Sequence, residues 1–422
     1  MRRLSPQAAF LALLLVTAPF ACSDTDEAPA NSTADGGSTD GPSAADTDTD
    51  TGTGTDTDTV AATDTATASG PPYAIGVTTL TTIGANGRQL PTEVWYPIAT
   101  GSKGTAVTYA LGLIPSPYGA LRDVPALPGP FPLLAFSHGN GGVRDQSVFL
   151  TEAVARQGYV VVSPDHIGNT ATTMDNNLGG VMSLWRPQDI SAAIDRVLKP
   201  QTEDGPWLTG LVDPDKIAIS GHSFGGYTSL ALAGMPVGLP AGVSLNCAAP
   251  EQVAACKEIE KLGPPPWDLG DPRIDVAIPL AHALYAAGVL AKPTGKVPAI
   301  PIILMAASGD TLTKPNLEAE PLYADLADQA ALVMIQGGSH YSFANICELM
   351  PFMPADLKAA VGNICNGSTK PTMDEVQAVV VEHTLAALDI WLRGNDNARK
   401  AFDPAKTTGP VYTIKSKGIY PK

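Results

Sequence analysis

A glycine-flanked serine stands between a strand-like segment and a helix-like segment, and this junction constrains the fold more than any other feature. The pentapeptide 221–225 (GHSFG) follows the β-rich segment 216–220 and precedes the small-residue segment 227–233. A sharp strand-to-helix turn strains the backbone at the serine and lifts its hydroxyl clear of the sheet. The flanking glycines let neighbouring chain pass close to that turn. The sequence therefore predicts a nucleophilic serine at Ser223, with an ordinary glycine-rich turn as the alternative.

Short apolar strands alternate with helices on both sides of this junction. Such alternation predicts an α/β fold, with a mainly parallel sheet covered by helices on both faces. A strand pair, 73–83 and 88–96, comes first, and a Pro- and Gly-rich stretch of weak periodicity follows it. The further expected strands are 131–137, 159–163, 216–220, 274–280, 300–307 and 331–336. The expected helices are 143–157, 188–198 (with Arg186-Pro187 at its start), 227–233 and 373–393.

Composition divides the chain into three parts. An export signal is predicted over residues 1–21. This segment has a basic start, the apolar stretch 8–16 and then small residues, as is typical of such signals. That apolar stretch is too short to span a membrane. Residues 22–70 are mostly Asp, Thr, Ser, Gly and Ala, so they are predicted to form a disordered tether. Residues 71–422 are long enough for one large domain, the predicted catalytic domain.

The charge pattern excludes some classes of partner and cofactor. The net charge is −16, and no basic stripe occurs along the chain, which argues against a nucleic-acid partner. No Gly-x-Gly-x-x-Gly follows a strand, and neither His-Glu-x-x-His nor Cys-x-x-Cys occurs. We therefore expect no cofactor and no metal.

Five cysteines are an odd number for an exported protein. The segment ending at Cys22 resembles a bacterial lipoprotein signal, although Pro19 stands where such signals usually have Leu. The resemblance implies lipidation of Cys22 and anchoring to the bacterial cell envelope, with a plain cleaved signal peptide as the alternative. Neighbour pairing of the other four predicts two disulfides, with four buried thiols as the alternative. These pairs are Cys247–Cys256 and Cys347–Cys365.

A serine nucleophile needs a base and an acid that orients the base. His340 lies in a loop directly after strand 331–336, and Asp310 follows strand 300–307. Together they give the chain order Ser, acid, His that is known for sheet enzymes with this serine turn. Asp271 and Asp275 are rival acids. The histidines that fit the base less well are His138, His166, His222, His282 and His383.

The negative charge that develops on a carbonyl oxygen needs backbone N–H donors. One expected donor is Phe224, the residue after the serine. The second is expected in the glycine-rich loop 137–142 (SHGNGG), which follows strand 131–137. Asn140 is the preferred donor there, and Gly139 is the alternative.

Three segments together resemble a known family: 137–146 (SHGNGGVRDQ), 163–170 (SPDHIGNT) and 221–226 (GHSFGG). They look like bacterial dienelactone-hydrolase-related esterases of the α/β-hydrolase superfamily, close to platelet-activating-factor acetylhydrolases and cutinase-like polyester hydrolases. The resemblance covers roughly 73–395. It implies a triad of Ser223, Asp310 and His340. Ser223 stands where dienelactone hydrolases have Cys, which makes dienelactone a doubtful substrate.

Some residues near these motifs allow two interpretations. Asp165 and His166 are expected to brace the nucleophile loop, and extra catalytic groups are the alternative. One of Trp185, Trp207 and Trp267 is expected to line an acyl pocket. Segment 243–272, with its paired cysteines, looks like an insertion after the serine turn and is a candidate cap over the site.

The expected function is hydrolysis of carboxylic esters through an acyl-enzyme on Ser223. The expected partner is a small-molecule ester, and the expected state is a monomer. A lipase, phospholipase or polyester hydrolase with the same triad is the first alternative. A non-catalytic surface binding protein on the same scaffold is the second.

Overall fold

The computed structural model describes residues 71–238, 253–293, 298–352, 371–406 and 411–420, together with the single positions 247, 248, 355, 358, 362 and 365. The predicted signal peptide 1–21, the tether 22–70 and the lipidation site Cys22 lie outside the described residues. Within the described part, none of the helices combines the length and the apolar character needed to cross a membrane.

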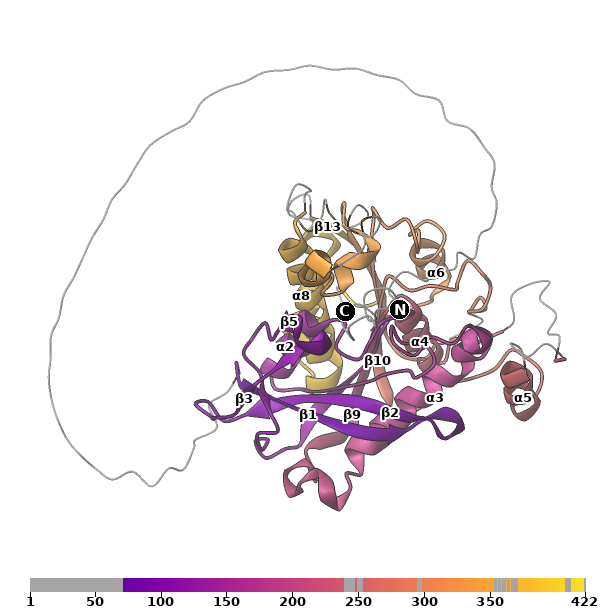
Figure 1. Ribbon diagram of the computed structural model, residues 1–422. Coiled ribbons are helices and arrows are strands. Elements are labelled where there is room, and N and C mark those ends of the chain that lie inside the picture. Colours follow the sequence, from indigo (N-terminus) through magenta and orange to yellow (C-terminus); the bar gives the residue numbers. More distant parts are fainter. Residues whose placement is uncertain are drawn as a thin grey trace, which may run out of the picture. The chain divides into compact units, whose positions relative to one another are not determined.

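Eleven strands form one sheet in the order β13-β12-β11-β10-β9-β7-β8-β2-β1-β6-β3. Figure 1 shows strands of this sheet with the helices around them. Every neighbouring pair from β12 through β8 is parallel, and β13, β2 and β3 pair antiparallel with their neighbours. The long strands are β1 (Ala74–Ile83), β2 (Gln89–Ile98), β7 (Phe131–Ser137), β8 (Val160–Pro164), β9 (Val212–His222), β10 (Ile274–Leu280), β11 (Ile302–Ala307), β12 (Ala330–Ile335) and β13 (Tyr412–Lys417). The two-residue strands are β3 (Thr105–Ala106), β4 (Thr108–Tyr109), β5 (Ile114–Pro115) and β6 (Leu121–Arg122), with β4 and β5 forming a separate pair.

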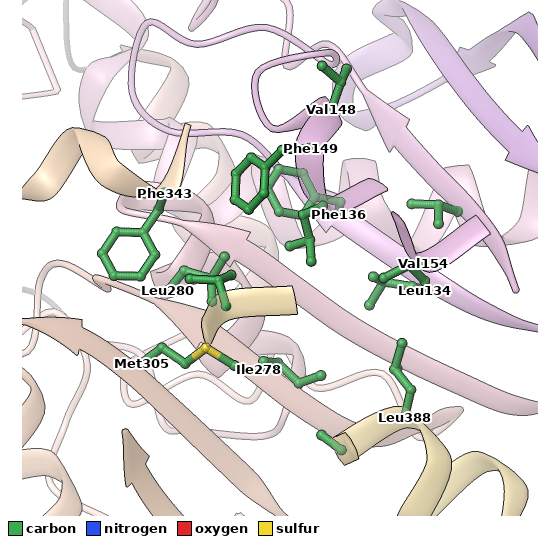
Figure 2. Packing of buried hydrophobic residues seen from close by; sticks show 14 of the residues in the cluster. Leu134, Phe136, Val148, Phe149, Val154, Ile278, Leu280, Met305, Phe343 and Leu388 are labelled. Atoms are coloured by element: carbon green, nitrogen blue, oxygen red, sulfur yellow. The ribbon is translucent and has the colours of Figure 1, made fainter. Parts of the chain in front are cut away.

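Successive side chains of a strand point to opposite faces of the sheet, so the apolar central strands present apolar groups on both faces. Helices cover both faces and bury these groups. Leu134 and Phe136 of β7 pack in one cluster with α2 (Val148–Arg156) and α8 (Met373–Arg393) (Figure 2). Leu133 and Ala135, which alternate with them along the strand, pack in the other cluster with three further helices. These are α3 (Gly179–Leu198), α4 (Phe224–Leu232) and α6 (Ala319–Asp325). Burial on both faces explains why the central strands are continuously apolar.

The helix predicted over 188–198 begins earlier than expected. In the structure α3 spans Gly179–Leu198 and runs through Pro187. Proline has no N–H to donate to the carbonyl four residues before it. The Tyr227 hydroxyl donates to that carbonyl, at Ser183, over 3.0 Å. The vacant acceptor is therefore satisfied from α4, and the proline does not end the helix.

Other boundaries also differ from the prediction. The helix predicted from residue 143 begins at Val148, because the turn before it uses its backbone and side chains for loop contacts. Helix α4 begins at Phe224, directly after the serine. Helix α5 (Val253–Leu262), α6 and β13 were not expected from the sequence. Both predicted disulfides, Cys247–Cys256 and Cys347–Cys365, are present.

The loops that carry the candidate residues leave the sheet at one edge. The last residues of β7, β9, β10 and β11 lie close to register with their neighbours, as Ser137 pairs with Gly221 and Leu280 with His222. Ala307 of β11 pairs likewise with the end of β12. In open parallel sheets the carboxyl edge is where ligands bind. The fold therefore gathers the loops of Asn140, Ser223, Asp310 and His340 at this edge.

Candidate active site

Ser223 occupies a strained turn between β9 and α4. Its φ of 58° and ψ of −114° place a non-glycine residue in a region that costs about 1–3 kcal/mol. Three backbone hydrogen bonds hold the turn: Ser223 N to Leu280 O at 2.9 Å, Ala283 N to Ser223 O at 3.3 Å and Tyr227 N to Ser223 O at 3.1 Å. Its side chain is only partly buried. The geometry agrees with the strand–turn–helix junction predicted from the sequence.

The two flanking glycines are required by close backbone approach. A Cβ at Gly225 would overlap the carbonyl oxygen of Ser137 and lie 2.9 Å from that of His138. A Cβ at Gly221 would lie 2.6 Å from the same Ser137 oxygen. Glycine at these positions thus lets the serine turn pack directly on the end of β7. This contact sets the position of the serine relative to the loop that follows β7.

Asp310 and His340 form a hydrogen-bonded pair. The Nδ1 of His340 lies 2.8 Å from Oδ2 of Asp310, and both residues are buried. The Thr313 hydroxyl donates to Oδ2 over 2.7 Å, and the backbone N–H groups of Leu312 and Thr313 donate to Oδ1 over 2.8 Å each. Burial alone would raise the pKa of Asp310, but the hydrogen bonds and charge of His340 and the bonds from Thr313 hold the pKa below its usual value. The carboxylate is therefore ionised and fixes the ring with Nε2 free to act as a base.

His222 links His340 to the loop after β7. Its Nε2 lies 2.9 Å from the backbone oxygen of His340, so this nitrogen carries the proton. Its Nδ1 accepts from the Gln146 amide over 3.0 Å, and Oε1 of Gln146 accepts from Gly139 N over 2.9 Å. Burial, with the nearby His340, lowers the pKa of His222 to about 3, which keeps the ring neutral. These contacts account for both ring nitrogens, in keeping with the expectation that His222 fits the role of base less well than His340.

In the loop after β7, the N–H groups of the three glycines have hydrogen-bond acceptors within the described part of the chain, in contrast to that of Asn140. Gly139 N donates to Gln146, Gly141 N to Asn169 O at 3.2 Å, and Gly142 N to Gly139 O at 3.0 Å. Among the described residues no partner is found for the N–H of Asn140. Phe224 is the first residue of α4, so its N–H has no partner within the helix either. The structure therefore favours Asn140 over Gly139 as the second donor.

A buried polar network lies beneath this loop. His166 is fully buried between Asp189 Oδ2, 2.9 Å from its Nδ1, and Ser137 Oγ, 2.9 Å from its Nε2. Burial, with the nearby Arg186, lowers the pKa of His166 and keeps it neutral. Asp165 binds the backbone N–H and guanidinium of Arg144. These contacts agree with a bracing role for Asp165 and His166.

Sequence reasoning missed Arg186, which stands immediately before Pro187 in α3. Its side chain is fully buried and donates to Ser137 Oγ over 3.1 Å. Arg186-Pro187 is expected from the sequence at the start of helix 188–198, whereas the structure places Arg186 within α3. The one available signal was a charged side chain at the end of the largely apolar stretch 181–186 (VMSLWR), which has one other polar residue, Ser183.

The rival acids and the remaining histidines have other contacts. Asp271 forms an ion pair with Arg273 at 2.6 Å, and Asp275 accepts from Ile217 N at 2.9 Å. His282 and His383 are buried, His383 within α8 as expected. Within the described part of the chain, no group of three or more His, Cys, Asp or Glu side chains could hold a metal ion.

The described part of the insertion packs against α3. Glu258 of α5 accepts from the Trp185 indole at 3.2 Å, and Ala255 packs in a cluster with Val181, Met182 and Trp185. The ring of Phe224, next to the serine, contacts the same cluster. Trp207 packs on Tyr96, and Trp267 donates to Gly263 O. Residues 243–246 and 249–252 of this segment lie outside the described residues.

Comparison with known proteins finds relatives that are distant in sequence. No family model matches the chain. Cutinases est2 and est1 of Thermobifida alba are 23% and 22% identical to it over 211 residues, which is 50% of this chain and 52% and 53% of the two relatives. The chain thus spans about half the length of the curated relatives it matches.

A solved structure extends the similarity to most of the fold. A ferulic acid esterase from Streptomyces cinnamoneus superposes with a TM-score of 0.54 at 20% identity, covering 78% of this chain and 93% of that one. With the mainly parallel sheet, its helices on both faces and the serine turn, this establishes an α/β-hydrolase fold. The resemblance to dienelactone-hydrolase-related and platelet-activating-factor-acetylhydrolase-like esterases stays a prediction.

Proposed function

We propose that this protein hydrolyses carboxylic esters, with Ser223 as nucleophile, His340 as base and Asp310 as the acid that orients His340. The observation that carries the proposal is the buried Asp310–His340 pair, at the same sheet edge as the strained serine turn. An ionised carboxylate on Nδ1 leaves Nε2 of His340 as the proton acceptor that a serine nucleophile requires.

The first half-reaction forms an acyl-enzyme. Ser223 Oγ attacks the ester carbonyl carbon while His340 Nε2 takes the hydroxyl proton. The carbonyl oxygen becomes an oxyanion, which the N–H groups of Asn140 and Phe224 stabilise. The tetrahedral intermediate then collapses, and the alcohol leaves with the proton from His340.

The second half-reaction regenerates the enzyme. Water loses a proton to His340 Nε2 and attacks the acyl carbon, forming a second oxyanion in the same position. The bond to Ser223 Oγ breaks, the carboxylic acid is released, and the proton returns to the serine. Asp310 stays ionised throughout and stabilises the imidazolium that forms twice in each cycle.

A panel of p-nitrophenyl esters tests this proposal. We expect hydrolysis of p-nitrophenyl acetate by the wild type and a loss of up to about 10⁶-fold in kcat in Ser223→Ala. Ser183→Ala, which removes an exposed hydroxyl on α3, serves as the control and should match the wild type. Equal rates in Ser223→Ala and wild type would refute the proposal and favour a non-catalytic scaffold.

Two observations favour large apolar esters, including polyesters, as a second candidate substrate class. Leu312 and Leu317 are 54% and 49% exposed, unusual for leucine, and both lie on the loop that begins at Asp310. Two relatives also carry the name cutinase. If this class is right, activity should rise from acetate to octanoate esters, and Leu312→Ser with Leu317→Ser should reduce only the long-chain rates. A maximum at acetate would reject it.

We further propose that the protein is exported and anchored by a lipid on Cys22. Two disulfides within the described residues are consistent with an oxidising compartment. Expression in a bacterium fed labelled palmitate should label the wild type and leave Cys22→Ala unlabelled and soluble. Label on neither protein would contradict the anchor.

A further inference from the structure

Arg186 is a fully buried cation directly beneath the loop that follows β7. Its Nη2 donates to the carbonyl oxygen of His138 and, over 3.1 Å, to Ser137 Oγ. Its Nη1 donates to Asn169 Oδ1 over 2.5 Å. Three of its acceptors thus belong to the two strand-end segments that surround Asn140.

Asn169 connects Arg186 to Asn140 through hydrogen bonds. Its amide nitrogen donates to Asn140 Oδ1 over 2.7 Å, and its backbone oxygen accepts from Gly141 N over 3.2 Å. The Asn140 side chain and the next residue, Gly141, are therefore tied to Asn169, which Arg186 binds. Two residues before Asn140, the carbonyl of His138 accepts from Arg186 directly, so the guanidinium supports the loop on both sides of Asn140.

Arg186 also reaches the other donor. Its guanidinium carbon lies 4.6 Å from the centre of the Phe224 ring. Its Nε donates to Thr228 Oγ1 over 3.3 Å, and that hydroxyl donates to Phe224 O over 2.9 Å. The same side chain thus supports the first residue of α4, where the second oxyanion donor lies.

The positive charge of Arg186 is not neutralised by direct contact with a carboxylate. Among the described residues it makes no direct ion pair. Ser137 and His166 stand between it and Asp189, whose own carboxylate binds Arg88 at 2.6 Å. Burial lowers the pKa of Arg186 to about 9, so the guanidinium keeps its charge at neutral pH. A buried cation in a low-dielectric site acts on nearby charge far more strongly than it would in water.

We propose that Arg186 is a positioning residue for the oxyanion site, holding the Asn140 and Phe224 donors in place and adding a fixed positive charge behind them. This inference rests on the proposed function. The backbone donors stabilise the transition state, and in this proposal α3 contributes to that stabilisation through Arg186, the residue before Pro187.

The test measures kcat and KM per active site, counted by fluorophosphonate titration, in Arg186→Lys and Arg186→Met. We expect kcat to fall about 10- to 100-fold in Arg186→Met and less in Arg186→Lys, with KM within about threefold. Binding of a trifluoromethyl ketone, which forms an oxyanion on the serine, should weaken in parallel with kcat. Arg196→Met, which breaks the ion pair with Asp204 far from this loop in the fold, is the control and should leave both unchanged.

Two results separate the possible failures. If Arg186→Met does not fold, the test rests on Arg186→Lys. The lysine keeps a buried cation, but a single ammonium group cannot donate to all the acceptors that the guanidinium binds. Unchanged kcat per titrated site and unchanged ketone affinity in a folded Arg186 variant would overturn this inference only. Absence of Ser223-dependent hydrolysis in the wild type would overturn the proposed function itself.

Discussion

The two sides of the serine turn are built differently. On the side of β11 and β12, side chains make the decisive contacts: the Asp310 carboxylate binds His340 and Thr313 directly. On the side of β7, the groups facing the site are backbone N–H donors, and the side chains lie behind them in the buried network of Arg186 and His166.

The difference follows from what each side has to do. A group that moves protons must change its charge during each cycle, so it is a side chain that titrates and is oriented by a neighbour. A group that stabilises an oxyanion must not move or titrate, so fixed backbone dipoles serve best. We therefore expect changes on the first side to act on proton transfer, and changes on the second to act through geometry.

Among the changes around Ser223 that leave the serine itself in place, the largest effect is expected for Asp310→Asn on the proton-transfer side. Loss of the carboxylate removes the charge that orients and stabilises the His340 ring, so kcat should fall by about 10⁴-fold with the fold intact. Stopped-flow or steady-state hydrolysis of p-nitrophenyl acetate measures this. Asp271→Asn alters the rival acid, whose partner is Arg273, and should keep kcat within about twofold. The reverse result would make Asp271 the acid.

Gly225→Ala is the corresponding change on the geometric side. Its Cβ would overlap the Ser137 carbonyl, so the serine turn and the end of β7 must separate. We expect a lower melting temperature, from about 1–3 kcal/mol of overpacking, together with a fall in kcat. Gly180→Ala in α3 is the matched control, because the nearest atom to its Cβ is 4.0 Å away. An unchanged variant at 225 would show that the close approach has no importance.

Most features that the sequence did not predict lie on the side of β7 and the buried network behind it. Ser223, Asp310 and His340 follow from motif, strand ends and chain order. The extent of α3 does not, because the Tyr227 hydroxyl that satisfies Ser183 comes from another helix. Arg186 was missed for the same reason, and the choice between Asn140 and Gly139 depended on where Gln146 points. Such contacts between distant segments leave no periodicity in the sequence.

His222 joins the two sides, and its neutral state makes a third prediction. Its pKa of about 3 lies below the ordinary 6.5, so the folded protein binds fewer protons there than the unfolded chain. Stability is therefore lost as the pH falls below 6.5, by about 2 kcal/mol between pH 6.5 and 5. His222→Gln lacks this loss, so its stability relative to wild type should improve by that amount on acidification. Chemical denaturation at pH 8, 6.5 and 5 measures it, and a constant difference would disprove it.

The smallest effect is expected for Thr313→Val. It removes one hydrogen bond to Asp310, whose other oxygen keeps the two backbone donors. We expect kcat to fall about tenfold, consistent with a bond of 1.5 kcal/mol to a charged group. Thr313→Ser keeps the hydroxyl and should retain wild-type activity. If Thr313→Ser and Thr313→Val lower kcat equally, loss of the hydroxyl hydrogen bond is not the cause of the effect.

The central claim is that Ser223 is the activated nucleophile of this fold. Reaction of the wild type with a fluorophosphonate, followed by peptide mass spectrometry, tests it most directly. The account predicts one label per chain, on Ser223, with labelling greatly slowed in Asp310→Asn and unaffected in Asp271→Asn. Label on another serine, or equal labelling of wild type and Asp310→Asn, would contradict it.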